Sequence, residues 1–183
     1  MRIVGGAWRG RRLAEIGRGD QAARLRPTAD RVRESVFNIL AAAGDPVTGA
    51  RVLDLFAGTG ALGLEALSRG AARAMFVDDG RVAERLLRQN IAALGAGDRA
   101  DILRRDATAL GPAPHAFDLV FLDPPYGRGL GARAIGSATS GGWLATGATL
   151  VWEEGSPPAA PAGFTLLDSR RYGDTEIAIL RAP

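Results

Sequence analysis

Residues 52–63 read Val52-Leu53-Asp54-Leu55-Phe56-Ala57-Gly58-Thr59-Gly60-Ala61-Leu62-Gly63, an apolar run that continues into a glycine-rich turn. The glycines fit G-x-G-x-x-G, the pattern of a strand-to-helix turn that binds dinucleotides, and Asp78 supplies the acid expected about twenty residues later. Glycine tolerates positive φ and a helix N-terminus offers free N–H groups, so such a turn brings the backbone close to a ligand. The turn alone does not identify that ligand.

On both sides of this stretch, short apolar segments alternate with segments of helical periodicity. The alternation predicts an α/β, Rossmann-like fold with a seven-stranded, mostly parallel sheet. The last strand is expected to be antiparallel, because its hairpin connection is too short for a parallel crossover. We expect strands at 51–56, 74–77, 100–104, 117–122, 148–152, 164–171 and 175–180, and helices at 61–69, 82–94 and 129–142, with a further helix that opens at 26–28 with Thr28 as its N-cap.

The composition limits the class of protein. The chain has 183 residues, of which 46% are hydrophobic and 23% charged, as expected for one globular domain. No apolar run reaches the ~18 residues of a membrane span, and the start lacks a signal-peptide core, so we expect a cytoplasmic monomer without membrane contact. The absence of cysteine excludes disulfides and thiolate catalysis, and with His115 as the only histidine we expect no metal site.

Positive charge is concentrated at the start of the chain. Residues 1–33 hold nine arginines and three acidic residues, whereas the remaining 150 residues hold 14 arginines and 17 acidic residues. This asymmetry predicts a basic hairpin or arm at 1–25, ahead of a catalytic domain at 26–183, that contacts a polyanion, although a solvated basic segment is the alternative. Trp8 fits both base stacking and anchoring of the arm. The candidates for contact with the polyanion are Arg2, Trp8, Arg9, Arg11, Arg12, Arg26, Arg31 and Arg33.

Carboxylates mark the ends of the first four predicted strands. They are Asp54, Asp78 with its neighbour Asp79, Asp106 and Asp123. One aspartate after a strand is explained by turn formation or helix capping. Four at one edge favour a ligand site, because ligands of open α/β sheets bind at the carboxyl ends of the strands.

Asp123-Pro124-Pro125-Tyr126 follows the fourth predicted strand. The two prolines fix φ and remove two N–H groups, which leaves a stiff loop with carbonyl acceptors, and Tyr126 adds a ring for stacking. Hydrogen-bond acceptors beside an aromatic ring suit a planar base that carries an exocyclic amine. We therefore expect Asp123, Pro124, Pro125 and Tyr126 to be the catalytic residues, although a simple proline turn would give the same four letters.

The stretch 54–60, with Asp78, Asp106 and 123–126, resembles the class I S-adenosylmethionine-dependent amino-methyltransferases. The stretches 2–6, 11–13, 26–40 and 60–70 narrow the resemblance to the RsmD family. The resemblance implies methylation of the N2 amine of guanine 966 in bacterial 16S ribosomal RNA during small-subunit assembly, with S-adenosylmethionine as the cofactor. It also implies that the cofactor contacts are Thr28, Asp54, Phe56, Gly58, Gly60, Asp78, Asp79, Asp106 and Ala107.

Three other classes of protein remain open. A dinucleotide-dependent oxidoreductase fits the glycines, but Asp54 would lie near the pyrophosphate and no acid for hydride transfer is evident. A DNA or other RNA amino-methyltransferase, acting on adenine N6 or cytosine N4, also uses an Asp-Pro-Pro-Tyr motif, but the chain is short for an enzyme that carries a DNA-recognition domain. A non-enzymatic RNA-binding protein would keep the basic arm without needing the acidic sheet edge.

Overall fold

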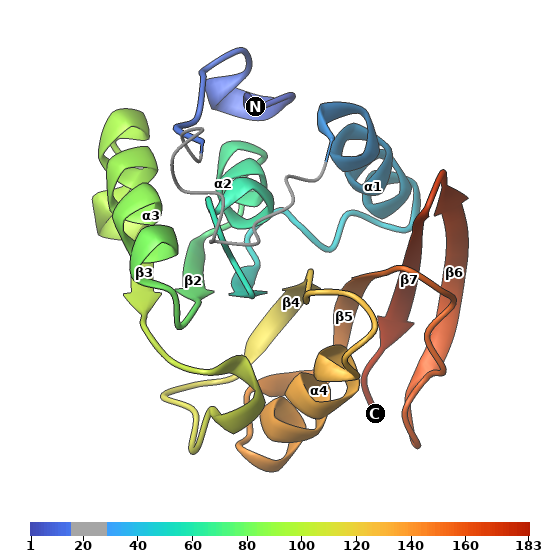
Figure 1. Ribbon diagram of the computed structural model, residues 1–183. Helices are drawn as coiled ribbons and strands as arrows, with labels where there is room; N and C mark the ends of the chain where they lie inside the picture. Colours follow the sequence, from blue (N-terminus) through green and yellow to red (C-terminus); the bar gives the residue numbers. More distant parts are fainter. Residues whose placement is uncertain (16–28) are drawn as a thin grey trace.

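The computed structural model describes residues 1–15 and 29–183, which form a seven-stranded sheet between two layers of helices (Figure 1). The strand order is β3-β2-β1-β4-β5-β7-β6. The first five strands are parallel, and β7 is antiparallel to both of its neighbours. The predicted sheet is thereby confirmed. The strands are β1 Arg51–Leu55, β2 Arg73–Val77, β3 Ala100–Leu103, β4 Phe117–Leu122, β5 Leu144–Glu154, β6 Thr165–Tyr172 and β7 Thr175–Arg181.

The helices cover both faces of the sheet. On one face, an apolar cluster joins the sheet to α1 (Asp30–Ala42), α2 (Ala61–Ser68) and α3 (Arg81–Leu94). On the other face, a second cluster joins the sheet to α4 (Leu130–Ser140). Neighbouring strand residues alternate between the clusters, as Leu119 and Val120 of β4 do. Strands covered on both faces are largely apolar, which explains why β4 is apolar from Leu119 to Leu122 and why Asp54 is the one polar residue among the buried positions of β1.

The start of α1 differs from the prediction. Its first residue is Asp30 and its N-cap position is Ala29, so the assignment of Thr28 as the N-cap was wrong; Thr28 itself lies outside the described residues. Ala29 has no capping side chain, but its carbonyl accepts the N–H groups of Val32 and Arg33. The negative charge of Asp30 in the first turn complements the helix dipole.

Residues 1–15 form the predicted hairpin, here called the N-terminal hairpin. Arg2 and Arg12 make an antiparallel bridge around a short 3-10 turn, Gly6–Trp8. The side chains of Ile3 and Leu13 are buried in the core, so the hairpin is packed against the sheet domain along its length. The proposed domain boundary at residue 25 lies outside the described residues. Within the described part of the chain, no helix is long and apolar enough to cross a membrane.

Candidate active site

The candidate site lies where the sheet order reverses, between β1 and β4. From β1 the chain continues outward to β2 and β3, whereas β4 leads to β5 on the other side. At their carboxyl ends the two strands touch, because the Asp123 N–H donates to the Leu55 carbonyl over 3.4 Å. Open α/β sheets bind ligands at this reversal, so the structure brings the glycine turn and the Asp-Pro-Pro-Tyr loop to one place.

The glycine turn at 58–60 has backbone angles that require glycine. Gly58 has φ +56° and Gly60 has φ +81°, and a Cβ at Gly60 would lie 2.6 Å from Cδ2 of Leu87 in α3. Phe56, at the entry to the turn, also has positive φ (+61°), which is uncommon for a bulky residue. The contact with Leu87 shows that the turn at Gly60 packs directly on α3, and strained backbone such as that of Phe56 gathers at functional sites.

Asp54 lies inside β1 and points at the first turn of α2. It is 2% exposed, and its Oδ2 accepts the N–H of Gly63 over 2.9 Å. Because Gly60 at the N-cap has no side chain, this carboxyl group satisfies a free N–H that a capping residue would otherwise satisfy. Burial raises the pKa of Asp54 to about 8, against the lowering effect of that hydrogen bond. Without a nearby cation, the group therefore keeps its proton at neutral pH.

Asp78 joins the end of β2 to the glycine turn. One carboxylate oxygen accepts the N–H of Gly58 and the other accepts the N–H of Gly80, each over 2.9 Å. Burial raises the pKa of Asp78, and the two hydrogen bonds oppose this rise. Asp79 is exposed beside it. The acid of the predicted fingerprint thus holds the turn in place, while a direct contact with a ligand stays a prediction.

Asp106 follows β3 and caps a short 3-10 turn, Ala107–Ala109. Its Oδ1 accepts both the backbone N–H and the hydroxyl of Thr108, each over 2.7 Å. These hydrogen bonds lower the pKa of Asp106, so it is ionised at neutral pH. Its neighbour Ala107 is 3% exposed. Asp106 is thus an ionised, exposed acceptor on a fixed turn, and its contact with an adenine amine stays a prediction.

The Asp-Pro-Pro-Tyr loop is fixed from the other half of the sheet. Pro124 is buried and Pro125 exposed, whereas Asp123 and Tyr126 are partly buried. The Tyr126 hydroxyl donates to Oε1 of Glu153 over 2.8 Å and lies 3.1 Å from the Thr175 hydroxyl. Burial, followed by the nearby acids, raises the pKa of Tyr126, so the phenol stays neutral.

Sequence reasoning missed the residues that orient Tyr126. Glu153 from β5 is 7% exposed, and Thr175 opens β7. A Cβ at Gly155 would lie 3.1 Å from Cδ2 of Tyr126, so the ring rests against backbone there. The run Glu153-Glu154-Gly155 at the end of the fifth strand was a usable signal, because it repeats the acidic pattern of the first four strands.

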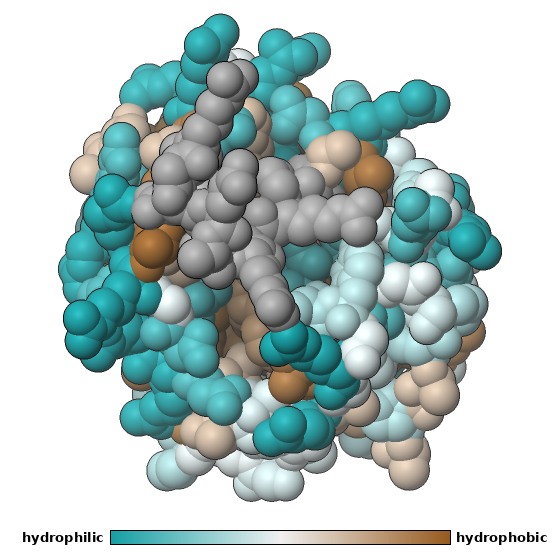
Figure 2. Space-filling model, in the orientation of Figure 1, coloured by the Kyte–Doolittle hydropathy of each residue, from teal (hydrophilic) through white to brown (hydrophobic). Residues whose placement is uncertain are grey.

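The basic candidates divide into exposed and buried residues. Arg2, Arg9, Arg11, Arg12 and Arg31 are exposed. Figure 2 shows hydrophilic side chains over the N-terminal hairpin at the top and over α3 at the left. Trp8 is partly buried, packs against the core and has the Arg99 guanidinium 5.2 Å from its ring centre, which favours the anchoring role. Arg26 lies outside the described residues.

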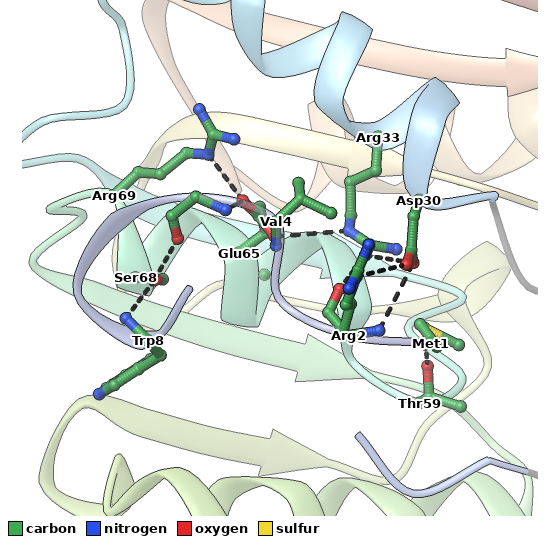
Figure 3. A network of polar contacts seen from close by, with 12 residues as sticks. Met1, Arg2, Val4, Trp8, Asp30, Arg33, Thr59, Glu65, Ser68 and Arg69 are labelled. Carbon is green, nitrogen blue, oxygen red and sulfur yellow. Dashed lines mark hydrogen bonds and ion pairs between the residues drawn. The ribbon is translucent and has the colours of Figure 1, made fainter. Parts of the chain in front are cut away.

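Arg33 corrects the prediction that it contacts RNA. Its side chain is 0% exposed and lies 3.5 Å from the buried carboxylate of Glu65 and 2.9 Å from the partly exposed carboxylate of Asp30 (Figure 3). It also donates to the Arg2 carbonyl. A buried cation needs such partners, so Arg33 fastens the hairpin and α1 to α2 and is not available to phosphates.

Comparison with known proteins gives a consistent set of relatives. A family model described as "Conserved hypothetical protein 95" matches residues 1–181. The chain is 41% identical over 169 residues to ribosomal RNA small subunit methyltransferase D of Escherichia coli K12, which covers 91% of this chain and 82% of that protein. A solved putative methyltransferase of Escherichia coli has a TM-score of 0.84 at 39% identity, with 100% of this chain and 97% of that one covered.

A more distant structure shares the fold. The Thermus thermophilus 16S rRNA N2 G1207 methyltransferase, solved in complex with S-adenosylmethionine and guanosine, has a TM-score of 0.65 at 20% identity. The match covers 85% of this chain and 44% of that one.

Proposed function

The chain belongs to the RsmD family, and we propose that it methylates the exocyclic N2 amine of a guanine, guanine 966 of 16S ribosomal RNA. At the coarser level it is an S-adenosylmethionine-dependent methyltransferase of small-subunit ribosomal RNA, as its relatives are named. The observation that supports the finer proposal most is the position of 123–126 at the end of β4, beside the glycine turn after β1.

The residues after β1, β2 and β3 fit S-adenosylmethionine. Gly58 and Gly60 have positive φ and no side chains, so a ligand can approach the backbone of the turn closely. Asp78 would accept from ribose hydroxyls and Asp106 from the adenine amine, beside Ala107. Asp54 beneath the turn would face the positively charged methionine end. When bound, the cofactor supplies a methyl group on a positively charged sulfur, which leaves as a neutral thioether.

The loop at 123–126 supplies the chemistry on the RNA side. A guanine amine is a weak nucleophile, because its lone pair is delocalised into the ring. Acceptors at the Asp123 carboxylate and the Pro124 carbonyl would hold both amine hydrogens and favour a pyramidal nitrogen. After the new N–C bond forms, one of these protons would be released to water. Tyr126, fixed by Glu153, would stack on the base. Most of the acceleration would then come from orientation and electrostatics.

The N-terminal hairpin supports an RNA substrate. Arg9, Arg11 and Arg12 are exposed on the hairpin, and Arg31 is exposed on α1. These side chains would hold phosphates, while the target base leaves its stack to reach the pocket. We propose that the substrate is the small subunit or an assembly intermediate and that the enzyme acts as a cytoplasmic monomer.

One assay tests the proposal against its alternatives. The protein is incubated with methyl-labelled S-adenosylmethionine and either immature small subunits, naked ribosomal RNA or duplex DNA, and the labelled nucleoside is identified after digestion. Label in N2-methylguanosine is expected. Label confined to N6-methyladenine or N4-methylcytosine would refute the proposal, and RNA binding without any transfer would favour a binding protein.

A single variant tests the catalytic loop. Asp123→Ala removes an acceptor at the reacting amine, so the rate of transfer should fall at least about 10²–10³-fold. The affinity for S-adenosylmethionine, measured by calorimetry, should stay within about twofold, because the cofactor contacts come from other strands. Equal losses of transfer and of cofactor binding would mean that the loop belongs to the cofactor site.

A further inference from the structure

Asn90 is a buried amide that joins two distant parts of the chain. It lies on α3 and is 1% exposed. Its Oδ1 accepts the N–H of Ala14 over 2.7 Å, and its Nδ2 donates to the carbonyl of Ala14 over 3.3 Å and to that of Thr59 over 2.9 Å. Ala14 belongs to the N-terminal hairpin, and Thr59 stands between Gly58 and Gly60. One side chain therefore contacts both the hairpin and the glycine turn.

Thr59 makes a second contact with the hairpin. Thr59 is 9% exposed, and its hydroxyl donates to Sδ of Met1 over 3.6 Å (Figure 3). The neighbouring parts of the turn are held from the sheet domain, since Asp78 binds the N–H of Gly58. The hairpin thus forms one wall of the turn, and Asn90 connects that wall to the turn's central carbonyl.

The other end of the hairpin is held independently of the turn. The carboxylate of Glu65 accepts the N–H groups of Val4 and Gly5, each over 2.8 Å. The hydroxyl of Ser68 accepts the N–H of Trp8 over 2.9 Å and donates to the carbonyl of Gly5 over 2.6 Å (Figure 3). Glu65 and Ser68 lie in the last turns of α2, whereas the glycine turn precedes its first residue. Changes at Ser68 therefore loosen the hairpin without touching the turn.

We propose that Asn90 is a positioning residue that couples the hairpin to the cofactor turn. A buried amide needs partners for its donors and acceptor, but that need does not require them to lie in these two segments. Because all three hydrogen bonds persist only when the hairpin is docked and the turn is in its observed conformation, each state stabilises the other. Coupling free energies are reciprocal, so cofactor binding secures the hairpin and a docked hairpin strengthens cofactor binding. The inference rests on the assignment of S-adenosylmethionine to the turn, and on no step of the RNA reaction.

Hydrogen exchange of the full-length protein, with and without saturating S-adenosylmethionine, tests the coupling. In the wild-type protein the cofactor should slow amide exchange in the glycine turn and also at Leu13 and Ala14 of the hairpin. In Asn90→Ala the cofactor should still protect the turn but should no longer change exchange at the hairpin. The dissociation constant of S-adenosylmethionine should rise at least about fivefold, the lower end of typical coupling.

Ser68→Ala is the matched control. It removes two side-chain hydrogen bonds to the hairpin, so hairpin exchange should be faster throughout. The protection that the cofactor gives to Ala14 should persist, however, and the dissociation constant should change less than twofold. If Asn90→Ala fails to fold, Asn90→Leu, which fills the space of the amide without its hydrogen bonds, replaces it.

The outcomes separate the coupling from the cofactor assignment. Wild-type protection of the turn without protection of the hairpin would overturn the coupling and leave the assignment standing. Cofactor-dependent protection of the hairpin in both Asn90 variants would also overturn it, since a purely structural amide gives that result. No protection of the turn by S-adenosylmethionine in the wild-type protein would overturn the cofactor assignment and the coupling together.

Discussion

Gly63→Ala should destabilise the protein although alanine is the better helix former. A Cβ at Gly63 would lie 2.4 Å from Cε1 of Phe76, 2.9 Å from its Cζ and 3.0 Å from Oδ2 of Asp54. Phe76 is 0% and Asp54 2% exposed, so neither can swing into solvent. The first turn of α2 would have to move off the sheet. Such overpacking costs about 1–3 kcal/mol, against about 0.5–1 kcal/mol gained from helix propensity.

Gly136→Ala in α4 is the control with the opposite expected sign. Gly136 is an exposed helical residue, and a Cβ there meets no atom within 4 Å. The free energy of unfolding of Gly136→Ala should be about 0.5–1 kcal/mol higher than that of the wild-type protein. For a chain of this size 1 kcal/mol shifts the melting temperature by about 2–4 °C. The net cost of up to about 2.5 kcal/mol in Gly63→Ala should therefore lower it by up to about 10 °C, and Gly136→Ala should raise it by about 1–4 °C.

Thermal unfolding with and without S-adenosylmethionine measures both variants. The rise in melting temperature caused by the cofactor should shrink in Gly63→Ala, because the N–H of Gly63 binds Asp54 under the cofactor turn. It should be unchanged in Gly136→Ala. A Gly63→Ala protein that melts as high as Gly136→Ala and keeps the full effect of the cofactor would refute the packing that we describe.

Three further predictions follow from the site. The pKa of Asp54 is raised to about 8, so the native state keeps a proton that the unfolded chain releases near pH 4. The free energy of unfolding should therefore fall by about 1.4 kcal/mol per pH unit as the pH rises between these values. Asp54→Asn should abolish this fall. Tyr126→Phe removes a donor to buried Glu153 and should cost about 1–3 kcal/mol of stability, with a larger loss in kcat than in cofactor affinity by calorimetry. Arg12→Ala should reduce the slope of log K against log salt for RNA by about 1, whereas Arg33→Met should lower the melting temperature and leave that slope unchanged; equal slopes in both variants would contradict the assignment of exposed and buried arginines.

The fold could be predicted from the sequence because its signals are local. Each strand and helix shows its own period, and the tight connection at Gly173 and Asp174 requires the antiparallel end of the sheet. The glycine turn and the loop at 123–126 were likewise found from contiguous residues. Their common position at one sheet edge follows from the parallel order of the strands.

The predictions failed where a residue's role depends on a distant partner. Arg33 is one of nine arginines in a basic segment, and only its pairing with Glu65, 32 residues further along the chain, shows that it is buried. The catalytic role of Tyr126 stays a prediction, but the support that its hydroxyl receives from Glu153 and Thr175 was not foreseen, because those residues lie on two other strands. Asp54 was expected at a strand end and lies inside β1, on the side that faces α2.

The place of β7 inside the sheet has a consequence for synthesis of the protein. β7 follows β6 along the chain but lies between β5 and β6, and β5 has no other neighbour on that side. While the chain emerges from the ribosome, β5 therefore presents an open edge until residues 175–181 have left the exit tunnel. Open strand edges pair with other chains, so the nascent protein is exposed to aggregation until its last strand is inserted. Ribosome-bound chains that stop before residue 175 should bind chaperones, and chains that extend past 181 by the length of the tunnel should not.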